Sequence, residues 1–297
     1  MKAIRVTKDS YGFRRLGRLM MVAFLLALIP TVGAQAQDDQ EYKRVYNSAI
    51  EAAKAKQYAQ AYELYTQAVQ LAQTAGDQEI VDKSKGVLAQ IDQAYATRAL
   101  RQENFEQALE HSETGIANDP NRAANYYNRG LALKKMDRID DAMAAFVETI
   151  EVAQANSDRR IANLATGAIS DHYTYLAGAA LNRNNNNPSR ADANEALEAL
   201  ATIEQFEQVE AGYEVFYYRA VAQRALGQPQ EALTSANQAL EMFRGSKSDG
   251  AKIHFVIGEI QMEQGNMDAA RVAFQEASYG QYKASAEHYL ENVIGGR

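Results

Sequence analysis

The chain has 297 residues and a formal net charge of −7. Hydrophobic residues make up 46% and charged residues 23%, values typical of a chain that buries a core, which excludes disorder throughout. Only four prolines and no tryptophan occur, and Ala, Gln and Glu are abundant, which favours helices over strands. The absence of cysteine excludes disulfides, thiol nucleophiles, thiolate metal sites and a lipidated N-terminal cysteine.

Residues 1–36 have the parts of a secretory signal peptide. Six basic residues precede the end of the apolar run Leu19–Val32, and Ala34-Gln35-Ala36 offers a small-x-small cleavage pattern. The run has about 14 residues, fewer than the roughly 20 that a membrane-spanning helix needs, so we expect cleavage and not a permanent anchor. The mature chain is expected to begin at Gln37, or at Gln35 if the cleavage pattern ending at Ala34 is used.

Removal of this segment makes the remaining chain more acidic. The segment carries six basic residues and one acidic residue, a net of +5, so a chain of −7 becomes a chain of −12. An acidic chain without a block of basic residues is poorly suited to bind phosphate backbones or anionic membrane surfaces. We therefore expect no nucleic-acid partner and, after cleavage of the signal, no integral membrane segment.

In the remaining chain, an alanine recurs with further bulky and small residues four and seven positions after it. The five occurrences begin at Ala61, Ala108, Ala142, Ala232 and Ala270. A small residue stands twelve positions before each of them, at Ala49, Ala96, Gly130, Ala220 and Gly258. Offsets of four and seven place side chains on one face of a helix, so each alanine is expected in a helix of its own.

The earlier small residue belongs to a preceding helix, and a tight turn is expected between the two. The turns fall at Lys56-Gln57, Glu103-Asn104, Asp137-Arg138, Gly227-Gln228 and Gly265-Asn266. A small residue on each helix lets two antiparallel helices approach closely, while the bulky residues fill the space toward the next pair. Because one such pair buries too little surface to be stable alone, the pairs are expected to stack.

This pattern resembles the tetratricopeptide repeat family. The most similar segments run from Tyr126 to Thr149 and from Ile257 to Ala277, and Ala108 and Ala142 are 34 residues apart, which is the family period. The resemblance implies an all-α solenoid of about six antiparallel helix pairs with a C-terminal capping helix, over residues 37–297. The pairs are expected near residues 42–75, 78–120, 123–156, 160–204, 210–244 and 250–280, with the capping helix at 282–294, its core from Ala284 to Val293.

Two segments depart from the regular period. The first two anchor alanines are 47 residues apart, and helical spacing from Val81 to Tyr95 predicts one lengthened helix from near Gln78 to Arg101 instead of a loop. In the fourth pair, a helix from about Arg160 to Leu181 is expected to carry Gly178 as its small residue. The following turn is lengthened by Asn182 to Pro188. The Asn184–Asn187 run within it is predicted to be an exposed loop, with a partner-contacting loop as the alternative.

The sequence holds no recognisable catalytic constellation. Its four histidines fall in separate repeats and form no metal-binding pair, and the carboxylates are scattered at positions expected to lie on solvated helix faces. A glycine-rich phosphate loop is also missing from the sequence. We therefore expect no enzyme activity, no cofactor and no metal site.

The resemblance implies that the first helix of each pair lines an inner, concave surface. Its lining positions lie three before, one after and four after the small residue, and Asn128 and Tyr218 are expected to reach the rim. The candidate partner-binding residues are Tyr127, Asn128, Leu131, Lys134, Tyr217, Tyr218, Val221, Arg224, Phe255 and Glu259, with Met262 beside them. Tyr and Arg are frequent in binding hot spots, although some of these rings could instead pack between helices.

These features predict an exported, non-enzymatic scaffold that binds protein or peptide partners through its concave face. The periplasm, or the periplasmic side of an outer membrane, is the expected location. The alternative is a periplasmic module that binds a glycan or peptidoglycan fragment in uptake or envelope assembly. Self-association through exposed solenoid ends is also compatible with the sequence.

Overall fold

The computed structural model describes residues 32–183 and 187–295, and within them the chain folds into helices with no strand. The expected signal peptide lies outside the described residues up to residue 31, and so do Asn184, Asn185 and Asn186 of the expected loop. The N-terminal helices are α1 (Val32–Lys54), α2 (Tyr58–Ala75), α3 (Gln78–Arg101), α4 (Phe105–Asn118), α5 (Ala123–Lys135), α6 (Ile139–Ala155) and α7 (Arg159–Leu181). The C-terminal ones are α9 (Arg190–Ile203), α10 (Tyr213–Ala225), α11 (Pro229–Met242), α12 (Lys247–Glu263), α13 (Met267–Ala277) and α14 (Lys283–His288).

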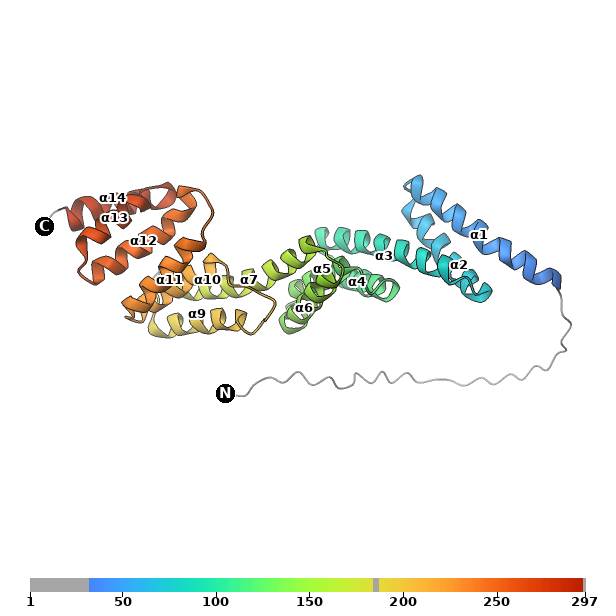
Figure 1. The fold of residues 1–297 in the computed structure, drawn as a ribbon, viewed down its shortest axis with the longest axis horizontal. Helices are drawn as coiled ribbons and strands as arrows, with labels where there is room; N and C mark the ends of the chain where they lie inside the picture. The colour runs from blue at the N-terminus through green and yellow to red at the C-terminus, as the bar shows by residue number, and fades with distance from the viewer. Residues whose placement is uncertain (1–31, 184–186, 296–297) are drawn as a thin grey trace.

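The helices stack in chain order into an elongated solenoid (Figure 1). Each odd-numbered helix from α1 to α5 packs on the helix that follows it, and the pairs α7–α9, α10–α11 and α12–α13 continue the series. The all-α solenoid predicted from the repeats is therefore confirmed. The lengthened helix predicted from Gln78 to Arg101 is also confirmed, because α3 has these bounds.

The same reversal of the chain joins the helices within most pairs. Two positions before the second helix, the backbone is left-handed, with φ between 58° and 80°, at Lys56, Glu103, Asp137, Gly227 and Gly265. The residue after the left-handed one then donates its N–H to a carbonyl five positions earlier, as in Gln57 to Ala52 at 2.9 Å and Asn266 to Gln261 at 2.9 Å. This pattern satisfies carbonyls left open at a helix end and reverses the chain within two residues.

The recurring small residues are the points of closest approach between helices. All five anchor alanines are fully buried, as are Ala49, Ala96 and Ala220, while Gly130 and Gly258 are also buried. Phe146 and Phe274, four residues after their anchors, are the largest fully buried side chains. The largest core cluster is continuous from α5 to α10, so the third and fourth pairs share one hydrophobic interior with the first helix of the fifth pair.

The C-terminal capping helix predicted over residues 282–294 is present, and its last part is π-helical. Gly280, with φ of 53°, begins a short 3₁₀ turn (Gly280–Tyr282), α14 follows, and a π-helical turn covers Tyr289–Ile294. The aromatic packing accounts for the irregular path, because Tyr289 stacks on Phe274 with ring centroids 4.7 Å apart while Tyr282 packs on Phe255. The segment still covers α13, since Ala286 and Ile294 are buried against it.

Candidate functional site

Six of the ten candidate residues line one cavity of about 230 Å³ in the C-terminal half of the solenoid. Tyr217, Tyr218, Val221 and Arg224 come from α10, and Phe255 and Glu259 come from α12. The C-terminal end of α7 closes one side with Leu181 and Asn182, and Tyr282 of the 3₁₀ turn lines another. Residues separated by 101 positions in the sequence therefore meet in one site.

The charged part of this cavity is a shared ion pair. Arg224 Nη1 lies 2.6 Å from Glu259 Oε2, and Arg224 Nε lies 2.8 Å from Glu263 Oε1. The Glu259 side chain is only 14% exposed, and this burial raises the pKa of its carboxyl group, although the neighbouring Arg224 acts in the opposite direction. Two carboxylates neutralise the single guanidinium, so Arg224 does not offer a free positive charge to an anionic ligand. The two ion pairs instead connect α10 to α12.

Aromatic rings form the other walls. Tyr217 meets Tyr218 edge to face with centroids 5.1 Å apart, and Phe255 lies 5.2 Å from Tyr282. The Lys252 ammonium lies 4.9 Å from the centroid of the Tyr217 ring, in a cation–π arrangement. Burial raises the pKa of the Tyr217 hydroxyl well above its ordinary value, so this phenol remains a hydrogen-bond donor over the physiological pH range.

The candidate residues of the third pair do not reach this cavity. The half-buried Tyr127 ring packs 5.8 Å from Phe146, and Leu131 packs on the same core, so both contribute to helix packing. Half-buried Lys134 has a pKa lowered by burial, while Asp171 of α7 acts to raise it. These residues belong to a separate stretch of the surface where α5 faces α7.

The expectation that Asn128 reaches the rim is wrong. Its side chain is only 6% exposed, and Nδ2 donates to the carbonyl oxygen of Gln93 and to Thr97 Oγ1, each at 3.2 Å. Both acceptors belong to α3. Asn128 therefore ties α5 to α3 between two pairs, a role that the spacing within one helix does not show.

Two residues of this surface were not among the candidates. Tyr175 on α7 is 72% exposed and stands three positions before Gly178, the same offset that selects Tyr127 and Tyr217. The repeat spacing could therefore have found it. Tyr282 lies in the irregular C-terminal segment, where no periodic pattern indicates that it reaches the cavity.

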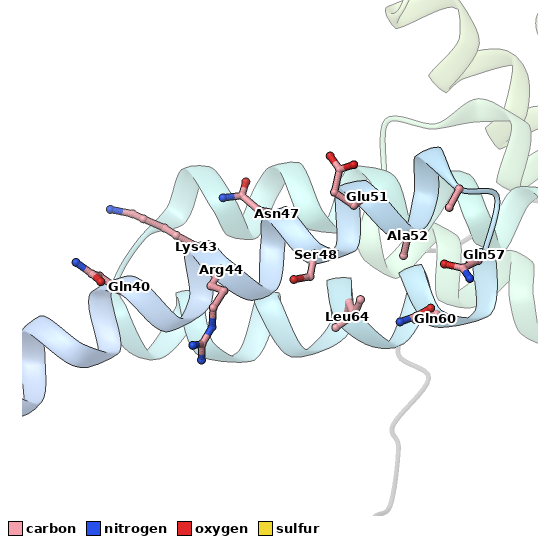
Figure 2. A pocket seen from close by; sticks show the side chains of 11 residues that line it. Gln40, Lys43, Arg44, Asn47, Ser48, Glu51, Ala52, Gln57, Gln60 and Leu64 are labelled. Atoms are coloured by element: carbon pink, nitrogen blue, oxygen red, sulfur yellow. The ribbon is translucent and has the colours of Figure 1, made fainter.

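A second hollow, of about 860 Å³, lies on the outer side of α1 and α2 (Figure 2). Its lining is largely polar and includes Lys43, Arg44, Asn47 and Glu51, with Leu64 as a large apolar member. This is the face of the first described pair that no earlier pair covers. Terminal repeats need a polar outer face for solubility, and the composition of this hollow fits that structural role.

The described residues bring together no metal-binding group. Across 32–183 and 187–295, no three His, Asp or Glu side chains converge as metal ligands would. His111, His172, His254 and His288 lie on four different helical segments. Across these same ranges, none of the helices has the length and apolar character needed to cross a membrane.

Comparison with known families identifies the repeats. The family model described as tetratricopeptide repeat matches residues 94–158 and 217–286, which correspond to the second and third pairs and to the last two regular pairs. Both segments are tetratricopeptide repeats, and the described residues fold as a tetratricopeptide repeat solenoid. The tetratricopeptide repeat fold is a protein-interaction scaffold, in which stacked helix pairs present an extended concave surface. No curated protein matches the chain.

Solved structures of tetratricopeptide repeat and related proteins are similar to the chain at low sequence identity. A tetratricopeptide repeat protein from Parabacteroides merdae has 15% identity and a TM-score of 0.32, covering 87% of this chain and 100% of its own. MamA from Desulfovibrio magneticus has 15% identity and a TM-score of 0.39, covering 67% and 96%. PilW, a type IV pilus biogenesis factor, has 14% identity and a TM-score of 0.32, covering 64% and 76%.

Proposed function

We propose that this tetratricopeptide repeat protein is an exported scaffold that binds a protein or peptide partner in the cavity between α7, α10 and α12. The observation that carries the proposal is the convergence of Tyr217, Tyr218 and Phe255 with the Arg224–Glu259 pair in one cavity. Concave, mainly apolar sites with a few fixed polar groups are the usual form of a binding pocket. Tyr and Arg also contribute most to hot spots in protein interfaces.

The size of the cavity favours a side chain of a larger partner over a whole small molecule. Its volume of about 230 Å³ is smaller than the roughly 300–1,000 Å³ of typical small-molecule sites. One large side chain of an extended segment could enter, while the neighbouring concave surface at Tyr175 contacts the rest of the partner. The Tyr217 hydroxyl and the N–H groups of Arg224 that Glu259 and Glu263 leave unpaired then offer hydrogen-bond donors in the cavity lining.

A plug in the cavity tests this proposal with a matched control. Val221→Phe adds a ring inside the cavity, and Val272→Phe makes the same change on α13 at a position that is 60% exposed and outside the lining. Partners are captured from a cell-envelope extract with each variant and with the wild-type chain, and melting temperatures are measured in parallel. We expect Val221→Phe to lose partners that Val272→Phe retains, at similar melting temperatures. Recovery of every partner by Val221→Phe would refute the assigned site.

A glycan or peptidoglycan fragment is the second candidate ligand. The observation that favours it is the presence of four aromatic rings, Tyr217, Tyr218, Phe255 and Tyr282, around one cavity, because aromatic faces stack on sugars. Calorimetric titration of the wild-type chain with soluble peptidoglycan fragments tests this candidate. Saturable heat that disappears in Val221→Phe would favour the glycan. The absence of binding heat would favour a protein or peptide partner.

Export rests on the N-terminal sequence. The basic start, the short apolar run and the Ala34-Gln35-Ala36 pattern support a cleaved signal and a periplasmic location. Intact mass of the protein purified from its native host tests cleavage. We expect the mass of a chain that begins at Gln37 or Gln35. A membrane-bound product that keeps residues 1–36 would contradict export by this route.

A further inference from the structure

A buried carboxylate lies at the junction of the first two helix pairs. The Asp92 side chain on α3 is fully buried, and its Oδ1 lies 3.1 Å from His111 Nδ1 on α4. Its Oδ2 accepts from Asn118 Nδ2 of α4 and from the Tyr62 hydroxyl of α2, each at 3.4 Å. The expectation that carboxylates occupy solvated helix faces is therefore wrong for Asp92, because three side chains from other helices satisfy it.

This carboxylate fixes the orientation of the His111 ring. The ring is 27% exposed, and its Nδ1 is directed at a carboxylate that solvent does not reach. The accessible edge is therefore the one that carries Nε2. A histidine oriented in this way presents one fixed nitrogen to a ligand, because the hydrogen bond at the other nitrogen sets the ring position.

His111 lines a cavity of about 400 Å³ between α3 and α4. Tyr95, Arg98 and Ala99 line it from α3, Gln102 from the turn that follows α3, and Gln107 and His111 from α4. The Tyr95 ring lies 5.2 Å from the His111 ring and provides an apolar wall. This cavity is separate from the one between α7, α10 and α12.

The lengthened α3 explains why the cavity is open. The spacing between Ala61 and Ala108 exceeds the regular period by about 13 residues, which corresponds to roughly 20 Å along a helix. Figure 1 shows α2 beside the N-terminal part of α3, with α3 continuing toward α4 and α5. The apolar cluster that joins α2 to α3 ends at Tyr95. The cavity is lined by α3 residues from Tyr95 onward, where this cluster ends.

The charge of this cavity is opposite to that of the chain. Its lining contains the Arg98 guanidinium, the His111 imidazole and two amides, but no carboxylate. The acids next to lining residues in sequence, Glu103, Glu106 and Glu110, are exposed and do not line it. The Arg98 guanidinium therefore has no carboxylate beside it in the lining and is left to attract an anion. The apolar faces of Tyr95 and Ala99 favour an organic anion over an inorganic one.

We propose that the cavity formed by Tyr95, Arg98, Gln102, Gln107 and His111 binds a small organic carboxylate. Arg98 pairs with the carboxylate, the Nε2 edge of His111 faces it, and the two glutamine amides contact the remaining polar atoms. Arginine presents a planar fork of donors that matches a carboxylate. This site is independent of the proposed partner-binding cavity, so either can fail without the other.

Histidine signals in an NMR titration test the site directly. The full chain has four histidines, so ¹³Cε1-labelled histidine gives few signals, and that of His111 is assigned by its loss in His111→Gln. If this variant does not fold, the same substitution at the other three histidines assigns it by elimination. The probes are succinate, its neutral analogue succinamide, and inorganic phosphate. We expect succinate to shift the His111 signal saturably, with the other three signals unchanged and with no shift from succinamide.

Arg98→Gln is the decisive variant, and Arg101→Gln on the same helix is its matched control. Both residues are exposed, but only Arg98 lines the cavity. Loss of a charge-assisted pair is expected to weaken succinate binding at least tenfold in Arg98→Gln and by less than twofold in Arg101→Gln. No saturable shift with succinate, an equal shift with succinamide, or equal affinity in both variants would overturn the proposal. Tighter binding of phosphate than of succinate would overturn the assignment to an organic carboxylate.

Discussion

The ring of Phe146 lies directly over the backbone of Gly130, and a methyl group placed on Gly130 would come within 2.6 Å of the ring. The same contact recurs in the last regular pair, where Gly258 would bring a methyl group to 2.8 Å from Phe274. In these two pairs, the twelve-residue offset between the small residue and the anchor alanine therefore has a steric cause. It sets the small residue of the first helix opposite the large ring of the second.

Gly130→Ala is expected to destabilise the protein by about 1–3 kcal/mol, because the buried ring must move to make room. Gly167→Ala is the matched control, since it makes the same change in a helix where nothing lies within 4 Å. There the alanine is expected to stabilise the protein by about 0.5–1 kcal/mol. Chemical denaturation measures both, and effects of the same sign would contradict the assigned contact.

The left-handed residue of each turn predicts stability changes of opposite sign for two substitutions. Lys56 occupies this backbone conformation with φ of 60°, whereas Gly265 occupies the equivalent turn at 80°. A side chain costs free energy in this region, so Lys56→Gly is expected to raise stability by up to about 1 kcal/mol and Gly265→Ala to lower it by about as much. Thermal and urea unfolding of both variants check the signs. A loss of stability in Lys56→Gly would show that its turn is held by other contacts.

The pair between Arg224 and Glu259 predicts unequal effects from removal of its members. Arg224→Ala leaves the mostly buried Glu259 carboxylate without its partner and is expected to cost about 3–5 kcal/mol. Glu263→Gln removes a 41% exposed member and is expected to cost less than about 1 kcal/mol. Denaturant unfolding at pH 7 compares the two. Similar losses of unfolding free energy in the two variants would mean that water stabilises the Glu259 carboxylate in place of Arg224.

Asp92 predicts a pH dependence of stability. Burial raises the pKa of its carboxyl group above the ordinary value of 3.8, while hydrogen bonds from His111, Asn118 and Tyr62 oppose the shift. The folded protein therefore binds the proton more tightly than the unfolded chain. The stabilisation from Asp92 is complete below pH 3.8 and decreases as pH rises through the pKa of the folded state.

The measurement is the difference in unfolding free energy between the wild-type chain and Asp92→Asn, followed from pH 4 to 7. As pH rises, we expect the wild-type chain to lose unfolding free energy relative to Asp92→Asn. Asp82→Asn, on the exposed face of the same helix, controls for the loss of one negative charge. Parallel curves for the wild-type chain and Asp92→Asn would contradict the raised pKa.

The repeats could be predicted because their signal lies within the sequence. Small and bulky residues at fixed offsets are needed wherever two helices touch, and the positions found in this way are buried in the structure. The long α3 was predictable for the same reason, since helical spacing continues from Val81 to Tyr95. The turns follow from the break in that spacing.

Contacts between pairs could not be predicted in this way. Asn128 and Asp92 have the sequence context of solvated helix positions, and their burial depends on donors and acceptors supplied by other helices. Tyr282 reaches the C-terminal cavity from an irregular segment, where no period fixes the direction of a side chain. Such positions depend on how far each pair is displaced along its neighbour, which single-helix periodicity does not encode.

The displacement of the first pair along α3 also has a consequence for the order of unfolding. The apolar clusters that hold α1 and α2 contain residues of α1, α2 and α3 alone, separate from the core that runs from α5 to α10. Local opening follows such boundaries, because a unit with its own small core can separate while the remainder stays folded. Amide hydrogens of α1 and α2 should therefore exchange with solvent together, at a lower opening free energy than those of α6 or α7. The first pair would then behave as an independently opening unit at one end of an otherwise cooperative stack.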